Sequence, residues 1–156
     1  MKLSLKLIIC LFMSSSLFAQ LTLEDYQMEL EIDKMEKREI YEEFIGDDVN
    51  KDFWDIYNAY EDKRLAMEVR RYDLVKNYSK DYFKITNDQA SNHLKVAEKL
   101  NVDFNKLITS YSNKIIKTHG GKVAMQFYQL ELYFLAVSRT ELIENIPSIA
   151  EMFNEK

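Results

Sequence analysis

Two histidines are the residues of this chain best suited to metal binding or acid–base chemistry. His93 and His119 are the only histidines, and they fall at opposite ends of one segment with a helical pattern. At a rise of 1.5 Å per residue they would lie about 39 Å apart, too far to share a metal within one chain. A metal bridged between two subunits, with Glu98 or Asp88 near His93, stays open as an alternative. Otherwise both are surface histidines, with His119 near a helix C-terminus, where positive charge is favoured.

Other site patterns are incomplete. The run DVNKD (48–52) matches the first half of a calcium loop, but Phe53 and Ala59 stand where a glycine and a bidentate glutamate are required. With three glycines in the whole chain, no glycine-rich loop can hold a phosphate. No serine, cysteine or threonine stands in a nucleophile elbow. We therefore expect a non-enzymatic protein that needs no cofactor.

Two arginines continue an apolar stripe at helical spacing, and this is the most unusual chemical pattern of the chain. The stripe consists of Phe53, Tyr57, Tyr60, Met67, Leu74 and Tyr78. Arg64 and Arg71 fall at the positions between them. If the stripe is buried there, each arginine needs a partner; if it rotates outward, both side chains reach water. For the buried case we predict an ion pair of Arg71 with Glu131, an acid within a mostly apolar helix.

The segment FWDIYNAY (53–60) holds four aromatic residues within two helical turns. The core would take the aromatic residues of the stripe, with Trp54 at its side as a helix–helix contact or as an anchor for a partner. If part of this helix face stays outside the core, it could instead form a binding surface. The candidates for that surface are Trp54, Tyr57, Tyr60 and Arg64.

These residues must be positioned by helices. Few segments alternate between apolar and polar residues as a strand does, and the residues that break helices, glycine and proline, are rare. We predict an all-α fold with four helices at about 23–45, 49–83, 87–118 and 122–145. A short C-terminal turn would follow Pro147, since the residue before a proline resists the helical conformation. The apolar stripes predict helices packed on helices. The unequal helix lengths predict an elongated antiparallel bundle or cradle.

Helix ends and solvent faces can also be assigned. Thr22 is expected to cap the first helix, and Asp47 or Asp48 the second. Gly120 suits the left-handed position after the third helix. The charged run EIDKMEKREIYEE (31–43) reads as a solvated face. Glu31–Lys34 and Asp33–Lys37 would pair across its turns. Apolar stripes should line the third helix at Ala90, Leu94, Ala97, Phe104, Ile108, Tyr111 and Ile115, and the fourth at Val123, Phe127, Leu130, Phe134 and Val137.

The sequence ITNDQ (85–89) predicts a capping box at the start of the third helix. The Thr86 hydroxyl can accept from the Gln89 N–H, and the Gln89 side chain can reach back to the Thr86 N–H. Ile85 stands where a hydrophobic staple would form. This motif explains the turn between the two long helices and requires no binding function.

The first 19 residues have the plan of a secretory signal peptide. Lys2 and Lys6 precede an apolar run (7–13), and a small residue, Ala19, precedes the expected cut. Cys10, within this segment, is the only cysteine, so the exported domain (20–156) has none. Removing two of 21 basic residues leaves 19 against 26 acidic ones, a net charge of −7. We therefore expect a periplasmic or secreted protein that neither binds nucleic acid nor inserts into a membrane.

The motif ITNDQ resembles the LTXXQ motif of the Spy/CpxP-like periplasmic proteins, with isoleucine in place of leucine. LTLED (21–25) resembles a second copy that lacks the glutamine. The segments 53–67 and 122–147 are similar to small exported helical proteins, including those labelled sensors of ECF-type sigma factors. The resemblance implies an all-helical fold, often a cradle-shaped dimer. It also implies roles in envelope stress, either holding unfolded clients without ATP or binding a sensor protein.

Three functions are compatible with these patterns. The first is a chaperone-like binding protein in envelope stress or its sensing, with protein partners or unfolded clients. The second is an adaptor that docks one membrane sensor or sigma-factor system through a helix face. The third is a metal-responsive protein. A homodimer would suit the long helices in each case.

Overall fold

The computed structural model describes residues 22–46 and 49–144, and these residues form helices and short connections only. The helices are α1 (Leu23–Ile45), α2 (Lys51–Asp81) and α3 (Asn87–Glu144), with a 3-10 turn, η2 (Tyr82–Lys84), after α2. The predicted all-α class is confirmed. The predicted signal peptide and the C-terminal turn lie outside the described residues. The predicted cap of the second helix at Asp47 or Asp48 is wrong, because α2 begins later and Asn50 caps it.

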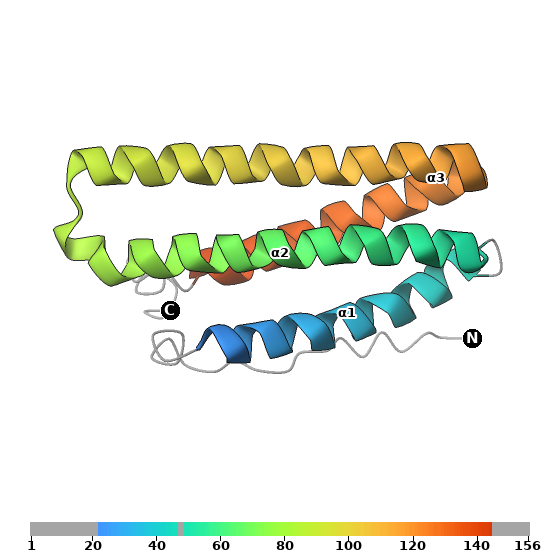
Figure 1. The fold of residues 1–156 in the computed structure, drawn as a ribbon, viewed down its shortest axis with the longest axis horizontal. Helices are drawn as coiled ribbons and strands as arrows, with labels where there is room; N and C mark the ends of the chain where they lie inside the picture. Colours follow the sequence, from blue (N-terminus) through green and yellow to red (C-terminus); the bar gives the residue numbers. More distant parts are fainter. Residues whose placement is uncertain (1–21, 47–48, 145–156) are drawn as a thin grey trace, which may run out of the picture.

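The helix count differs from the sequence prediction, because α3 spans both the third and the fourth expected helices. Gly120, within α3, has φ 82° and ψ 174°, a conformation that essentially only glycine adopts. Figure 1 shows α3 passing along α2, bending sharply and returning beside α2. We call the two parts the first arm (87–119) and the second arm (121–144). A single glycine reverses the chain, so no separate linker divides the arms.

Side chains cap each helix at its N-terminus. Thr22 and Asp25 form a reciprocal capping box on α1, with the Asp25 N–H donating to Thr22 Oγ1 at 3.1 Å. The predicted box on α3 is confirmed: the Thr86 N–H donates to Gln89 Oε1 at 2.9 Å, and the Gln89 N–H donates to Thr86 Oγ1 at 3.3 Å. The cap of α2 is Asn50, whose side chain accepts from two N–H groups of the first turn.

The main apolar core lies where α1, the first half of α2 and both arms of α3 meet. Tyr60 packs edge-on against Tyr111 of the first arm and Phe127 of the second, with ring centroids 5.5 and 5.1 Å apart. A smaller cluster joins the N-terminal part of α1 to α2 through the stacked rings of Tyr26 and Tyr72. The buried residues of the main core are Tyr41, Ile45, Phe53, Tyr57, Tyr60, Leu100, Phe104, Ile108, Tyr111, Ile115, Val123, Ala124, Phe127 and Leu135.

The predicted apolar stripes are correct near the bend of α3 and wrong away from it. Leu94 is 60% exposed and Val137 is 38% exposed. On the first arm, burial begins only at Leu100, since the end of α3 that carries Leu94 extends past α1 and the second arm (Figure 1). Fewer neighbours cover that end. No helix among the described residues is long and apolar enough to cross a membrane.

Candidate functional site

A cluster of charged side chains occupies the interior between the helices. Six charged residues are buried among those described, three positive and three negative, and they come from α1, α2 and the second arm of α3. We call them the charge network. Its members are Lys37, Glu61, Arg64, Glu68, Arg71 and Glu131.

Lys37 joins all three helices at one end of this network. Its ammonium lies 2.7 Å from Glu61 Oε1 of α2 and 3.0 Å from Glu131 Oε1 of α3. The hydroxyls of Tyr41 and Tyr60 donate to the two oxygens of Glu131 at 2.7 and 2.6 Å. The buried Glu131 carboxylate therefore has a cation and two hydroxyl donors, as a charge in the interior requires.

Along α2 the network continues with alternating charge. Arg64 Nε and Nη2 donate to Glu61 Oε1 and Oε2 at 2.9 and 2.8 Å, a bidentate pair. Arg71 Nη1 donates to Glu68 Oε2 at 3.0 Å and to Ser138 Oγ at 3.3 Å. The spacing of three and four residues places all four side chains on one face of α2. The network thus extends from Lys37 to the point where Ser138 meets α2.

The pKa values of the two buried acids of α2 are shifted in opposite directions. Burial favours a neutral Glu61, but the positive charges of Lys37 and Arg64 outweigh it and hold the pKa of Glu61 below its ordinary value. Burial raises the pKa of Glu68, because Arg71 and Arg64 only partly offset the loss of solvent. Burial also raises the pKa values of Tyr41 and Tyr60, and the nearby Glu131 charge raises them further. Both tyrosines therefore remain neutral donors.

The predicted ion pair between Arg71 and Glu131 is wrong, although both side chains are buried. Arg71 pairs with Glu68, and Glu131 pairs with Lys37. The reason is local: Glu68 precedes Arg71 by one helical turn on the same face, so Arg71 has a partner on its own helix. The predicted Asp33–Lys37 pair is wrong too, since Lys37 turns inward, whereas Glu31–Lys34 is present at 3.9 Å.

Three of the four residues predicted for a binding surface are buried. Tyr57 and Tyr60 are 1% exposed and Arg64 is 8% exposed, so the core and the charge network use them. Trp54 is half-buried, with the Arg38 guanidinium 4.3 Å above its ring. Aromatic rings at helical spacing mark a core more often than a surface.

An exposed apolar face does exist, but it lies on the second arm of α3. From Val123 to Ser138 the only charged residue is Glu131, which points inward. The outward side chains of this stretch are therefore uncharged. We call this surface the uncharged face; its large exposed members are Met125, Tyr128, Leu132, Tyr133 and Val137.

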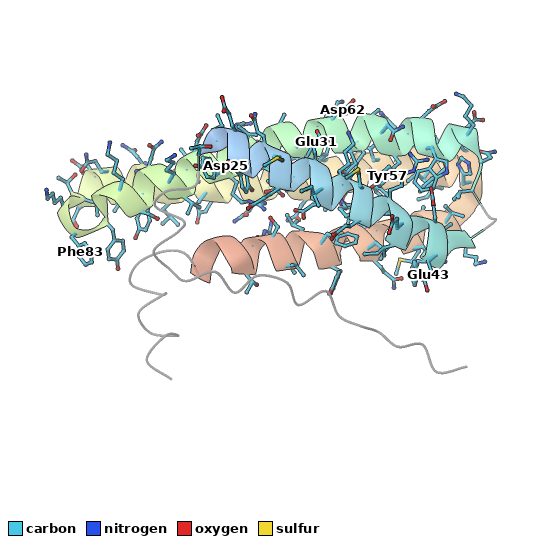
Figure 2. All side chains as sticks on the ribbon, turned by 90° about the horizontal axis from the view of Figure 1, so that it is seen from below. Asp25, Glu31, Glu43, Tyr57, Asp62 and Phe83 are labelled. Carbon is cyan, nitrogen blue, oxygen red and sulfur yellow. The ribbon has the colours of Figure 1, made fainter. Side chains whose placement is uncertain are left out.

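A second exposed stripe runs along α1. Met28, Ile32 and Met35 are 62%, 46% and 63% exposed, at spacings of four and three residues. They lie opposite the buried side of α1, which carries Tyr26, Leu30, Lys37, Tyr41 and Ile45. Helix α1 is therefore apolar on two sides, and the described part of the chain buries only one of them. Figure 2 shows α1 (blue) running obliquely across the front, from beside α2 (green) toward the second arm of α3 (red).

The two histidines serve in local contacts at opposite ends of the first arm. His93 packs against the Tyr78 ring with centroids 5.7 Å apart. His119 Nε2 lies 2.9 Å from Asn50 Oδ1, the side-chain oxygen that caps α2. Within the described ranges no three histidine, cysteine or acidic side chains are grouped to hold a metal.

No family model, curated protein or solved structure matches this chain.

Proposed function

We propose that this chain is a non-enzymatic exported protein that works by binding other proteins in envelope stress or its sensing. The uncharged face of α3 carries this proposal. Three in ten residues of the chain are charged, and the solvent side of a helix is usually where such residues gather. A stretch of α3 with outward methionine, leucine, valine and two tyrosines is the kind of surface that marks an interaction site.

The chemistry of this face suits unfolded segments of other proteins. Tyrosine and methionine bury apolar area and adapt to differently shaped partners. No charge on this stretch has to be desolvated, because Glu131 is already satisfied inside by Lys37 and the two tyrosine hydroxyls. The face can therefore cover apolar segments without selecting one charge pattern. This supports a chaperone-like role of the Spy/CpxP type.

The arrangement of the helices supports the same role. We propose that α1, α2 and the two arms of α3 form an elongated antiparallel bundle, in which the core near Gly120 and the charge network fix the second arm. A rigid support limits the entropy that the protein itself loses when a client binds. The exposed residues of the second arm then act as a preformed surface.

The test is suppression of client aggregation by residues 20–156. We expect the wild-type protein to suppress aggregation of an unfolded client at near-stoichiometric ratio. The double variant Leu132→Glu/Tyr133→Glu should lose most of this effect, because two charges interrupt the uncharged face. The matched control is Leu94→Glu/Val102→Glu, with the same added charge on exposed apolar positions of the first arm. Equal suppression by both double variants, or none by the wild type at several-fold excess, would contradict the proposal.

A second candidate is an adaptor that docks one partner, and the outer stripe of α1 favours it. Met28, Ile32 and Met35 form a narrow row, which suits one helix of a partner better than many unrelated segments. A photo-crosslinking residue at position 35 distinguishes the two, when the protein is exposed to envelope extract. One dominant adduct supports the adaptor, and many weak adducts support the chaperone-like role.

A further inference from the structure

Arg139, directly after the uncharged stretch of α3, has an unused hydrogen-bonding edge. Its Nε and Nη2 atoms are both shielded from solvent, and neither has a hydrogen-bond partner in the described part of the chain. These two atoms form one side of the guanidinium group. That side holds a carboxylate through two parallel hydrogen bonds.

The same molecule shows what an occupied edge looks like. Arg64 uses its own Nε and Nη2 atoms to hold the two oxygens of Glu61, at 2.9 and 2.8 Å. Both arginines present the same pair of donors away from solvent. The difference is that the edge of Arg64 meets a carboxylate and the edge of Arg139 does not. A buried donor without an acceptor lowers stability, so a ligand that filled this edge would be bound favourably.

The helix that carries Arg139 offers no acid at the distances that pair on a helix. Such pairs form between residues three or four positions apart. For Arg139 those positions are Leu135, Ala136, Leu142 and Ile143, all apolar. An acceptor for this edge must therefore come from another segment or another molecule.

A second unused donor lies at the same end of the charge network. Arg71 is 5% exposed, and its Nη2 atom is buried without a hydrogen-bond partner in ranges 22–46 and 49–144. Its Nη1 atom lies 3.3 Å from the hydroxyl of Ser138, the residue next to Arg139. Burial lowers the pKa of Arg71, Glu68 opposes that effect, and the positive charge of Arg139 lowers the pKa further. The cations Arg71 and Arg139 thus lie near each other. Glu68 accepts hydrogen bonds from both Arg71 and Ser138.

The buried charges of the described residues are balanced without Arg139. The charge network balances three positive against three negative side chains. Arg139 adds one positive charge at the end where the unused donors are. A singly charged planar group with two oxygens matches both the surplus charge and the geometry of the guanidinium edge.

We propose that Arg139, supported by Arg71, forms a binding site for one carboxylate group, a site separate from the uncharged face. The carboxylate has two potential sources with the same chemistry. One is an acidic side chain or chain end of a bound peptide. The other is Glu151 or Glu155 of this chain, which lie outside the described residues.

The test follows the arginine Nε–H signals of residues 20–156 by NMR, with sodium acetate as the probe. Sodium chloride at equal ionic strength is the reference. We expect the Arg139 Nε–H signal to move downfield and to exchange more slowly, in a saturable manner, with acetate only. Arg139→Lys assigns this signal and keeps the charge but loses the two-donor edge. Acetate affinity of that variant, followed by the Ser138 amide, should fall about tenfold. Arg70→Gln, at an exposed arginine beside Arg71, is the matched control and should leave both the signal and the affinity unchanged.

The double variant Glu151→Gln/Glu155→Gln separates the two sources. If a glutamate of this chain fills the edge, the wild-type signal already lies downfield and ignores acetate, while the double variant moves upfield and regains the response. If the source is external, wild type and double variant respond alike. An Arg139 signal that responds to acetate in neither protein, or equally to chloride, would overturn the proposal.

Discussion

The ammonium group of Lys37 lies 2.7 Å from the carboxylate of Glu61 in the interior of the protein, and each side chain is at most 5% exposed. An ion pair at the surface contributes little, but one in the interior is costly to break, because the remaining charge stays without solvent. The pair connects α1 to α2, and Glu131 extends it to α3. The contribution of each member can be measured separately.

Lys37→Met should lower the free energy of unfolding by about 3 kcal/mol, since it removes the cation nearest to Glu131. Glu61 keeps its ion pair with Arg64 in this variant. Most of the destabilisation therefore comes from Glu131, whose buried charge loses its cation. Urea denaturation at neutral pH measures the change. Lys34→Met is the control, because the partners of Lys34 are exposed and lie 3.7 and 3.9 Å away; it should cost less than about 1 kcal/mol. Equal losses in the two variants would contradict this account.

Two buried tyrosines of α2 should respond differently to loss of the hydroxyl. The Tyr60 hydroxyl donates to the charged Glu131 at 2.6 Å, so Tyr60→Phe should cost about 1.5–3 kcal/mol. The Tyr57 hydroxyl is buried and has no hydrogen-bond partner among the described residues, so Tyr57→Phe removes an unsatisfied group and should be neutral or stabilising. Chemical denaturation of both variants checks the contrast, and a Tyr57→Phe that costs as much as Tyr60→Phe refutes it.

The two acids of α2 should give opposite pH trends. The pKa of Glu61 is lowered in the folded state, so its contribution to stability is present above the unfolded value of about 4.5 and is lost as the pH falls below it. The pKa of Glu68 is raised, so its contribution is present below about 4.5 and is lost as the pH rises through the folded pKa.

The measurement is the free energy of unfolding of Glu61→Gln and Glu68→Gln, relative to wild type, from about pH 3 to pH 7. The deficit of Glu61→Gln should grow as the pH rises, because wild type gains stability that the variant lacks. The deficit of Glu68→Gln should shrink over the same range. Parallel curves for the two variants would show that the assigned pKa directions are wrong.

The adjacent glycines of α3 should respond with opposite signs to alanine. Gly120 has φ 82° and ψ 174°, so Gly120→Ala should cost about 1–3 kcal/mol through backbone strain alone, since nothing lies within 4 Å of an added Cβ. Gly121 also has free space and shows no positive φ. Gly121→Ala should stabilise by about 0.5–1 kcal/mol through helix propensity. Thermal unfolding measures both, and a loss at Gly121 as large as at Gly120 contradicts the assignment of the bend.

The helices could be predicted from the sequence because their ends depend on short local patterns. The Thr86–Gln89 box and the position of Gly120 follow from neighbouring residues alone. The merging of the last two helices into α3 could not be predicted, because one glycine can either end a helix before a linker or reverse it directly. Its ψ angle decides between them, and tertiary packing sets that angle.

The charge network was only half visible in the sequence. Arg64 and Arg71 stood out because they continue an apolar stripe, and Glu61 and Glu68 precede them by three residues on the same face; that spacing is the signal that could have identified their partners. Lys37 gave no such signal, because it stands in a run of charges of both signs. Only the position of α1 against α2 and α3 determines which charge of that run turns inward.

The bonds of Lys37 and Tyr41 have a mechanical consequence for α1. Apolar contacts depend on shape but require no particular bond direction. The ammonium and hydroxyl contacts with Glu61 and Glu131 are directional, so a shift of one helical turn, about 5.4 Å, would break all of them together. These contacts therefore fix the position of α1 along its own axis. A partner that binds the outer stripe of α1 can shift the helix along its axis only by breaking them.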